Sequence, residues 1–234
     1  MNQTLTKQCV AEFIGTFALC FVGILAIHHN PGLLGVALAH GLTIAVMASA
    51  FGAISGGHFN PAVSVGLFVA GKMDAMRAGA YIVTQLVAAT AAGFLIIGMM
   101  GNVGTNDPVI GETMRVMSKG IVAAGTPDLG AGVTQFQGII MEAVLTFFLV
   151  VVIFGTAVDS RAPKIGGLAI GLTVALDILA GGPISGAAMN PARTFGPALA
   201  SGHWNNHIVY WIGPLVGGAL AGLIYGRFLI KESK

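Results

Sequence analysis

Long apolar runs separated by short polar breaks dominate the chain. Residues 13–71 contain no Asp, Glu, Lys or Arg, and a helix needs about 20 apolar residues to cross a bilayer, so this stretch holds more than one crossing. Continuous runs of this length exclude a membrane β-barrel, whose strands alternate over about ten residues. The runs and their breakers predict six membrane-spanning helices, at residues 8–29, 33–54, 78–100, 135–157, 165–183 and 207–228.

Two shorter apolar segments are left over, at residues 60–71 and 190–201. A helix over either segment would be about 18 Å long, which is about half of a ~30 Å hydrocarbon core. We therefore expect each segment to enter the membrane and return on the same side. A bilayer tolerates such a segment only where protein or pore water surrounds its exposed backbone.

Composition supports an integral membrane protein. The chain is 55% hydrophobic and only 9% charged, whereas soluble domains carry about 25% charged residues. A formal net charge of +2 leaves no basic surface that could follow a nucleic-acid backbone. Cys9 and Cys20 are the only cysteines, and no spacing of His, Cys and carboxylates suggests a metal site. We expect no cofactor, no metal and no enzymatic activity.

The basic residues predict the orientation of the chain. Six crossings place only Arg115 and Lys119 on one side of the membrane. Basic residues favour the cytoplasmic side, so both termini are predicted to be cytoplasmic in a multi-pass protein of the cell membrane. The basic residues on that side would be Lys7, Lys72, Arg77, Arg161, Lys164, Arg227, Lys231 and Lys234.

The chain contains an internal repeat. The sequence SGGHFNPA at residues 55–62 resembles SGAAMNPA at residues 185–192, at an offset of 130. Glu12 and Glu142, the sole carboxylates inside the first and fourth predicted spans, lie at the same offset. The repeat divides a single domain, residues 1–234, into a first repeat (1–101), an extracellular connecting loop (102–133) and a second repeat (134–234).

Each repeat holds three crossings, and three is odd, so the second copy must enter the bilayer upside down. Inverted repeats commonly place the working site near mid-membrane, at interrupted helices. Asn is a favoured N-cap, and Pro suits the first helical position. The short helices are therefore expected to begin at Asn60-Pro61 and Asn190-Pro191, with their positive dipole ends facing each other.

These features resemble the aquaporins of the major intrinsic protein family over nearly the whole chain. The resemblance rests on two Asn-Pro-Ala boxes in inverted register, with an Arg after the second: Asn60, Pro61, Ala62, Asn190, Pro191, Ala192 and Arg193. It implies an all-α membrane protein with six transmembrane helices and two re-entrant half-helices in an inverted 3+3 repeat. It also implies a homotetramer whose subunits are passive water channels that exclude protons and ions.

The two Asn side chains offer a physical account of that exclusion. Each can present an amide donor where the helix N-termini meet. A water molecule passing in single file would turn its oxygen toward both donors, and a water held in this way cannot pass a proton along the file. The positive helix ends also oppose a hydronium ion.

The resemblance further implies a narrow selectivity filter of His40, Ile178, Ala187 and Arg193. This set is similar to plant vacuolar-type channels and to the animal ammonia-permeable type, so we hypothesise that ammonia and hydrogen peroxide pass as well as water. Glycerol facilitators tend to have Trp and Gly at the first two positions and Asp after the Arg, where this chain has Thr194. A glycerol-type facilitator is nevertheless an alternative.

The remaining polar residues allow more than one interpretation. Glu12 and Glu142 could relay protons in a coupled secondary transporter, or could accept hydrogen bonds that brace the re-entrant segments, which we favour. His58 is predicted to brace its own segment. Asp128 stands where the similar branch has a filter-extending His in its long loop. Asp177, beside Ile178, is expected to have a hydrogen-bonded or protonated packing role.

Overall fold

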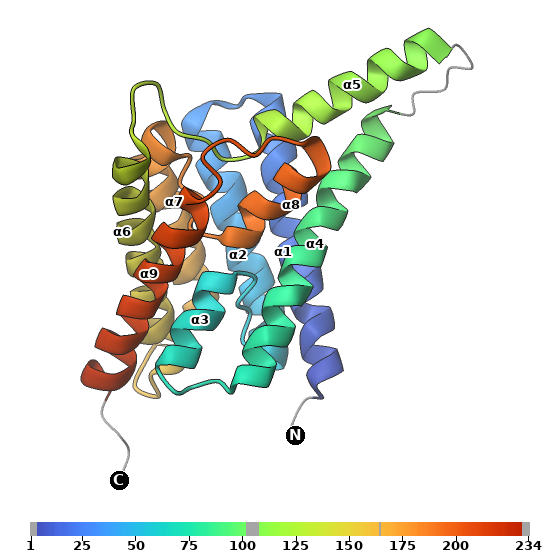
Figure 1. Ribbon diagram of the computed structural model, residues 1–234. Coiled ribbons are helices and arrows are strands. Elements are labelled where there is room, and N and C mark those ends of the chain that lie inside the picture. Colours follow the sequence, from blue (N-terminus) through green and yellow to red (C-terminus); the bar gives the residue numbers. More distant parts are fainter. Residues whose placement is uncertain (1–3, 102–107, 164, 231–234) are drawn as a thin grey trace.

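The computed structural model describes residues 4–101, 108–163 and 165–230. Within these residues six helices are long and apolar enough to cross a membrane, as predicted (Figure 1). They are α1 (Leu5–His29), α2 (Gly32–Ser55), α4 (Ala75–Gly101), α6 (Gln135–Ile153), α7 (Gly166–Ser185) and α9 (Val209–Leu223). The π-helical turns η1 (Phe154–Val158) and η2 (Ile224–Leu229) continue α6 and α9. Lys164, Lys231 and Lys234, used above for orientation, lie outside the described residues.

The two short segments form half-helices, α3 (Pro61–Val69) and α8 (Pro191–Ser201). Asn60 and Asn190 are their N-caps, and each helix has its Pro in the first turn, as the sequence predicts. Figure 1 shows α3 in the half of the bundle nearer the two chain ends and α8 in the opposite half. The two half-helices therefore approach the middle from opposite sides.

The connection between the repeats contains a helix that the sequence pattern did not predict. Residues 102–133 were expected to form a loop, but α5 (Pro108–Ala124) occupies 17 of them. Arg115 donates two hydrogen bonds to the Glu112 carboxylate, one turn earlier on the exposed side. Figure 1 shows α5 running outward beside the end of α4. Its charged face makes this segment too polar to be recognised as a membrane span.

The two repeats meet where α2 crosses α7. A Cβ atom added to Gly41 would lie 2.5 Å from the Gly171 carbonyl oxygen, and one added to Gly171 would lie 2.3 Å from the Gly41 oxygen. The two glycines are 130 positions apart, so the crossing repeats itself about a pseudo-twofold axis. Small residues permit such close approach of membrane helices. A methyl group on either glycine would overlap the backbone of the other helix.

The half-helices pack against long helices of the opposite repeat in the same paired manner. A Cβ on Gly66 of α3 would lie 2.8 Å from the Gly218 oxygen of α9. A Cβ on Gly196 of α8 would lie 2.2 Å from the Ala89 carbonyl carbon of α4. Each half-helix is therefore held at its depth by backbone contact with the other half of the molecule.

Candidate functional site

Two buried carboxylates hold the re-entrant segments. Glu12 on α1 accepts hydrogen bonds from the backbone N–H groups of His58 and Phe59, at 2.9 and 2.6 Å, and from the Ser55 hydroxyl at 2.6 Å. Both side chains of this pair, Glu12 and its counterpart Glu142, are fully buried.

Glu142 on α6 repeats the arrangement. It accepts from the backbone N–H groups of Ala188 and Met189, at 2.9 and 2.6 Å, and from the Ser185 hydroxyl at 2.7 Å. The Tyr210 hydroxyl donates to the Ser185 carbonyl, as the Tyr81 hydroxyl donates to the Ser55 carbonyl. A buried backbone N–H needs an acceptor, and these carboxylates supply one where the chain reverses inside the bundle.

The two N-cap asparagines tie the segments to each other. The oxygen of Asn60 accepts from the Ala62 N–H, while its amide nitrogen donates to the Met189 carbonyl at 2.7 Å. The amide of Asn190 donates to the Phe59 carbonyl at 2.9 Å. An amide nitrogen carries two hydrogens, so one N–H of each Asn is used in this cross-tie and the other remains. The cross-tie could not be read from the Asn-Pro-Ala boxes alone.

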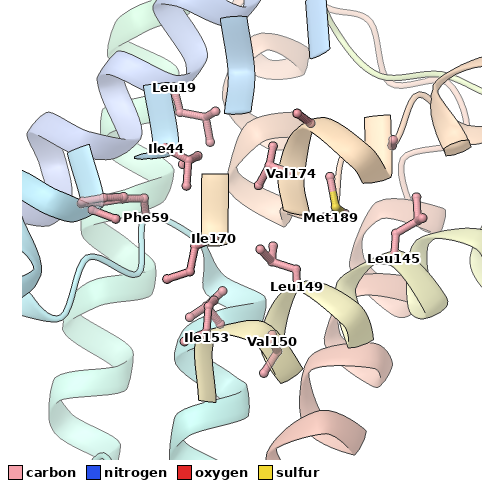
Figure 2. Close-up of a cluster of buried hydrophobic side chains, with 14 of the residues drawn as sticks. Leu19, Ile44, Phe59, Leu145, Leu149, Val150, Ile153, Ile170, Val174 and Met189 are labelled. Carbon is pink, nitrogen blue, oxygen red and sulfur yellow. The ribbon is translucent and has the colours of Figure 1, made fainter. Parts of the chain in front are cut away.

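A cavity runs between these segments, and both Asn side chains line it. All four residues expected in the filter, His40, Ile178, Ala187 and Arg193, line the same cavity. The rest of its wall is largely aliphatic, and several of these side chains are labelled in the buried hydrophobic cluster of Figure 2. The aliphatic residues include Leu19, Val36, Ile44, Leu149, Ile153, Ile170 and Val174. An apolar wall with few polar positions favours small neutral solutes over ions.

His40 and Arg193 form the polar side of the filter. The Nδ1 atom of His40 lies 2.8 Å from the Val36 carbonyl oxygen, which can only accept, so Nδ1 carries the hydrogen. The Nε2 atom then presents a lone pair to Nη2 of Arg193, 3.4 Å away. Gly23 makes room for the imidazole, because a Cβ there would lie 2.3 Å from Nε2. Within the described residues, the buried Nη1 of Arg193 has no hydrogen-bond partner.

His58 lines the cavity at the first re-entrant segment and belongs to a polar network. Its Nδ1 lies 3.0 Å from the Ser64 hydroxyl. The Gln85 amide donates to Glu12 at 2.8 Å and to Ser64 at 3.3 Å. These contacts fit the predicted bracing of this segment.

The sequence assigns Asp128 no role of its own, although it takes the position of a filter-extending His in the similar branch. Pro127 lines the cavity, and Asp128 does not. Its carboxylate instead pairs with His203 at 3.0 Å and accepts from the Asn206 amide at 2.8 Å. No sequence signal links His203 to Asp128, which lies 75 positions earlier.

Asp177 is buried in α7 but is absent from the cavity wall. Its Oδ2 atom has no hydrogen-bond partner among the described residues. The hydrogen-bonded alternative predicted for this carboxyl is therefore not seen at Oδ2.

The profile of one protein family, described as Major intrinsic protein, matches residues 1–225. The chain belongs to the major intrinsic protein family. Members of this family, the aquaporins, are channels and not enzymes.

Several aquaporins are similar along almost their whole length. Aquaporin TIP4-4 of Zea mays is 42% identical, with 97% of this chain and 88% of that protein covered. Aquaporin TIP4-1 of Arabidopsis thaliana is 44% identical over 97% of this chain and 87% of its own length. Aquaporin TIP2-1 of the same plant is 39% identical, with coverages of 97% and 89%.

The aquaporin fold is also found among solved structures. The aquaglyceroporin from Plasmodium falciparum superimposes with a TM-score of 0.78 over 97% of both chains, at 23% sequence identity. At that identity the match supports the fold alone. This chain is thus a multi-pass membrane channel of the aquaporin family, with the predicted six-helix and two-half-helix architecture.

Proposed function

We propose that the protein is a passive water channel and that its conducting path is the cavity between the two re-entrant segments. The observation that supports this most directly is the meeting of two capped helix N-termini, where Asn60 and Asn190 both line the cavity. Each amide retains one N–H that the cross-tie does not use. A passing water can accept from both, and its reorientation interrupts a proton wire.

In this proposal the filter is formed by His40, Ile178, Ala187 and Arg193. The Arg193 guanidinium lines the cavity and supplies a positive charge that repels cations. Ile178 and Ala187 give the opposite wall an apolar character. Permeation of ammonia and hydrogen peroxide, both small and uncharged, is the finer part of the proposal.

The geometry favours a channel over a proton-coupled transporter. A proton relay needs a carboxylate that the conducting path can reach. Glu12 and Glu142 are fully buried, absent from the cavity wall and occupied by backbone N–H groups. The bracing role is therefore the one that we propose for both. A glycerol-type facilitator is a second candidate, supported only by the fold that this chain shares with an aquaglyceroporin.

Orientation and assembly complete the proposal. The described ends of the chain lie at the same end of the bundle (Figure 1), together with Arg161, whose guanidinium donates to the Leu229 carbonyl at 3.3 Å. We propose that this end is cytoplasmic, because it gathers the basic residues, and that the working form is a homotetramer. Chemical cross-linking in membranes would test the assembly.

The deciding experiment compares wild type with Arg193→Ala in proteoliposomes. Stopped-flow light scattering would measure water and glycerol uptake, and a pH dye inside the vesicles would report alkalinisation under an ammonium gradient. We expect rapid water flux in wild type, and increased glycerol and cation leakage in Arg193→Ala because the positive charge and its bulk are gone. Val63→Ala, at the pseudo-symmetric position, is the control for loss of side-chain volume without loss of charge. Water flux no faster than in empty vesicles would refute the channel, and flux without alkalinisation would remove ammonia.

A further inference from the structure

The outer end of the second re-entrant segment is covered by residues 127–134, which precede α6 and are called the covering segment. The Gly130 N–H donates to the Ile184 carbonyl at 2.8 Å. A Cβ atom on Gly186, whose φ is +80°, would lie 3.2 Å from Cβ of Pro127 and 3.3 Å from the backbone N and O of Asp128. The covering segment therefore rests directly on the residue before Ala187.

This contact borders the cavity. Pro127 and Ala187 both line it, as does Gly186 between them. The position of the backbone at residues 127–128 therefore determines the position of one wall at the outer mouth of the cavity. Nothing within Pro127 itself holds it there, since a proline has no N–H to donate.

The side chain of Asp128 fixes the position of this backbone through hydrogen bonds. Its Oδ2 lies 3.0 Å from Nε2 of His203, and its Oδ1 accepts from the Asn206 amide and the Leu129 N–H, both at 2.8 Å. Partial burial acts to raise the pKa of Asp128, but the hydrogen bonds from Asn206, Leu129 and His203 outweigh it and lower the pKa. The group is thus a carboxylate at neutral pH.

The loop after α8 forms hydrogen bonds with residues at both ends of the covering segment. Asn206, in the left-handed conformation at φ +49°, donates to Asp128 and accepts from the Gln135 amide at 3.0 Å. The His203 N–H donates to the Ser201 hydroxyl at the end of α8. The clamp formed by Asp128, His203 and Asn206 therefore connects the covering segment to the half-helix that begins with the filter arginine.

We propose that Asp128 is a positioning residue that sets the width of the outer mouth by holding Pro127 against Gly186. The proposal rests on the proposed channel function. Releasing the clamp lets the Pro127 wall retreat, which helps a solute wider than water and matters little to water. Asp128 is thus a determinant of solute size that acts through its neighbour and not by touching the solute.

The test measures water and glycerol permeability of proteoliposomes and compares their ratio. We expect Asp128→Ala to raise the glycerol-to-water ratio several-fold while water permeability changes little. Asp128→Asn keeps an acceptor for Asn206 and Leu129, so a smaller rise is expected. Asp128→His combined with His203→Asp restores an acid–imidazole pair across the same gap and should return the ratio toward wild type. Asp74→Ala is the matched control, because Asp74 pairs with Arg77 in an exposed connection between α3 and α4.

The outcomes separate the two proposals. Wild-type vesicles that transport water no faster than empty ones would overturn the proposed function. If wild type conducts but the ratio in Asp128→Ala and Asp128→Asn equals that of wild type, the clamp does not set the width. A proportional fall in both permeabilities leaves the ratio unchanged and overturns the proposal equally.

Discussion

The two re-entrant segments share one backbone design and differ in the side chains placed on it. In both, a buried glutamate accepts two backbone N–H groups and a serine hydroxyl. Both have a non-glycine residue in the left-handed region just before the Asn, Phe59 at φ +51° and Met189 at φ +52°. The duplicated features are thus those that reverse the chain and cap the half-helix.

The polar side chains beyond these frame residues, in contrast, are not duplicated. The first segment has the network of His58, Ser64 and Gln85, whose positions in the second are Ala188, Thr194 and Pro214. The second has Arg193, where the first has Val63. The buried Thr194 hydroxyl has no partner among the described residues, whereas the Ser64 hydroxyl has three. The frame is therefore duplicated, whereas the guanidinium of Arg193 lines the cavity from the second segment and has no charged counterpart at Val63.

The largest difference in stability between the two segments is expected at their buried glutamates. Glu142→Gln places an amide NH2 against the backbone N–H of Ala188 or of Met189, and the hydrogen-bond partners of Glu142 among the described residues include no side-chain amide that could turn to accept from it. Each buried group left without a partner costs about 1–3 kcal/mol. In Glu12→Gln, by contrast, the Gln85 side chain can turn its unpartnered Oε1 toward the new amide. We expect Glu142→Gln to lower the thermal unfolding temperature in detergent clearly more than Glu12→Gln does.

Gln85→Leu supplies the control for that difference. With the accepting amide removed, Glu12→Gln in the Gln85→Leu background should become as destabilising as Glu142→Gln. Equal losses for the two single glutamine variants in the wild-type background would show that the Gln85 network gives the first segment no additional tolerance.

The crossing of α2 and α7 tests the symmetric part of the comparison. Gly41→Ala and Gly171→Ala each push a methyl group into the partner carbonyl oxygen, and overpacking of this kind costs about 1–3 kcal/mol. Because the two positions are equivalent, we expect similar reductions of the unfolding temperature. Gly98→Ala in α4, where nothing lies within 4 Å of the added Cβ, is the control and should be nearly neutral. Very unequal losses at Gly41 and Gly171 would contradict a symmetric crossing.

The sequence predicted most of the frame because its signals are local. Six spans follow from run length, and the half-helices follow from an N-cap Asn followed by Pro. Contacts that depend on how the repeats face each other had no such signal. The donation from the Asn60 amide to Met189, and the Asp128–His203 pair, join residues far apart in sequence. Helix α5 has no such signal, because charged residues interrupt its apolar residues and no continuous apolar run marks it.

The smallest predicted effect concerns the connections between the first two spans of each repeat. Between α6 and α7, Asp159 accepts hydrogen bonds from the Arg161 side chain and backbone N–H, and these lower its pKa to about 2. The pseudo-symmetric position in the first repeat is the exposed His29, the last residue of α1. A folded-state pKa below the unfolded value of about 3.9 means that the stabilisation is present above pH 4 and is lost as the pH falls toward 2. Asp159→Asn should therefore lower the unfolding temperature slightly at pH 7, because the Arg161 side chain of this pair is 56% exposed and ion pairs with an exposed partner contribute little, and the difference from wild type should vanish near pH 2. His29→Gln should match wild type throughout this range, and a difference for Asp159→Asn that persisted undiminished at pH 2 would show that the carboxylate charge is not its source.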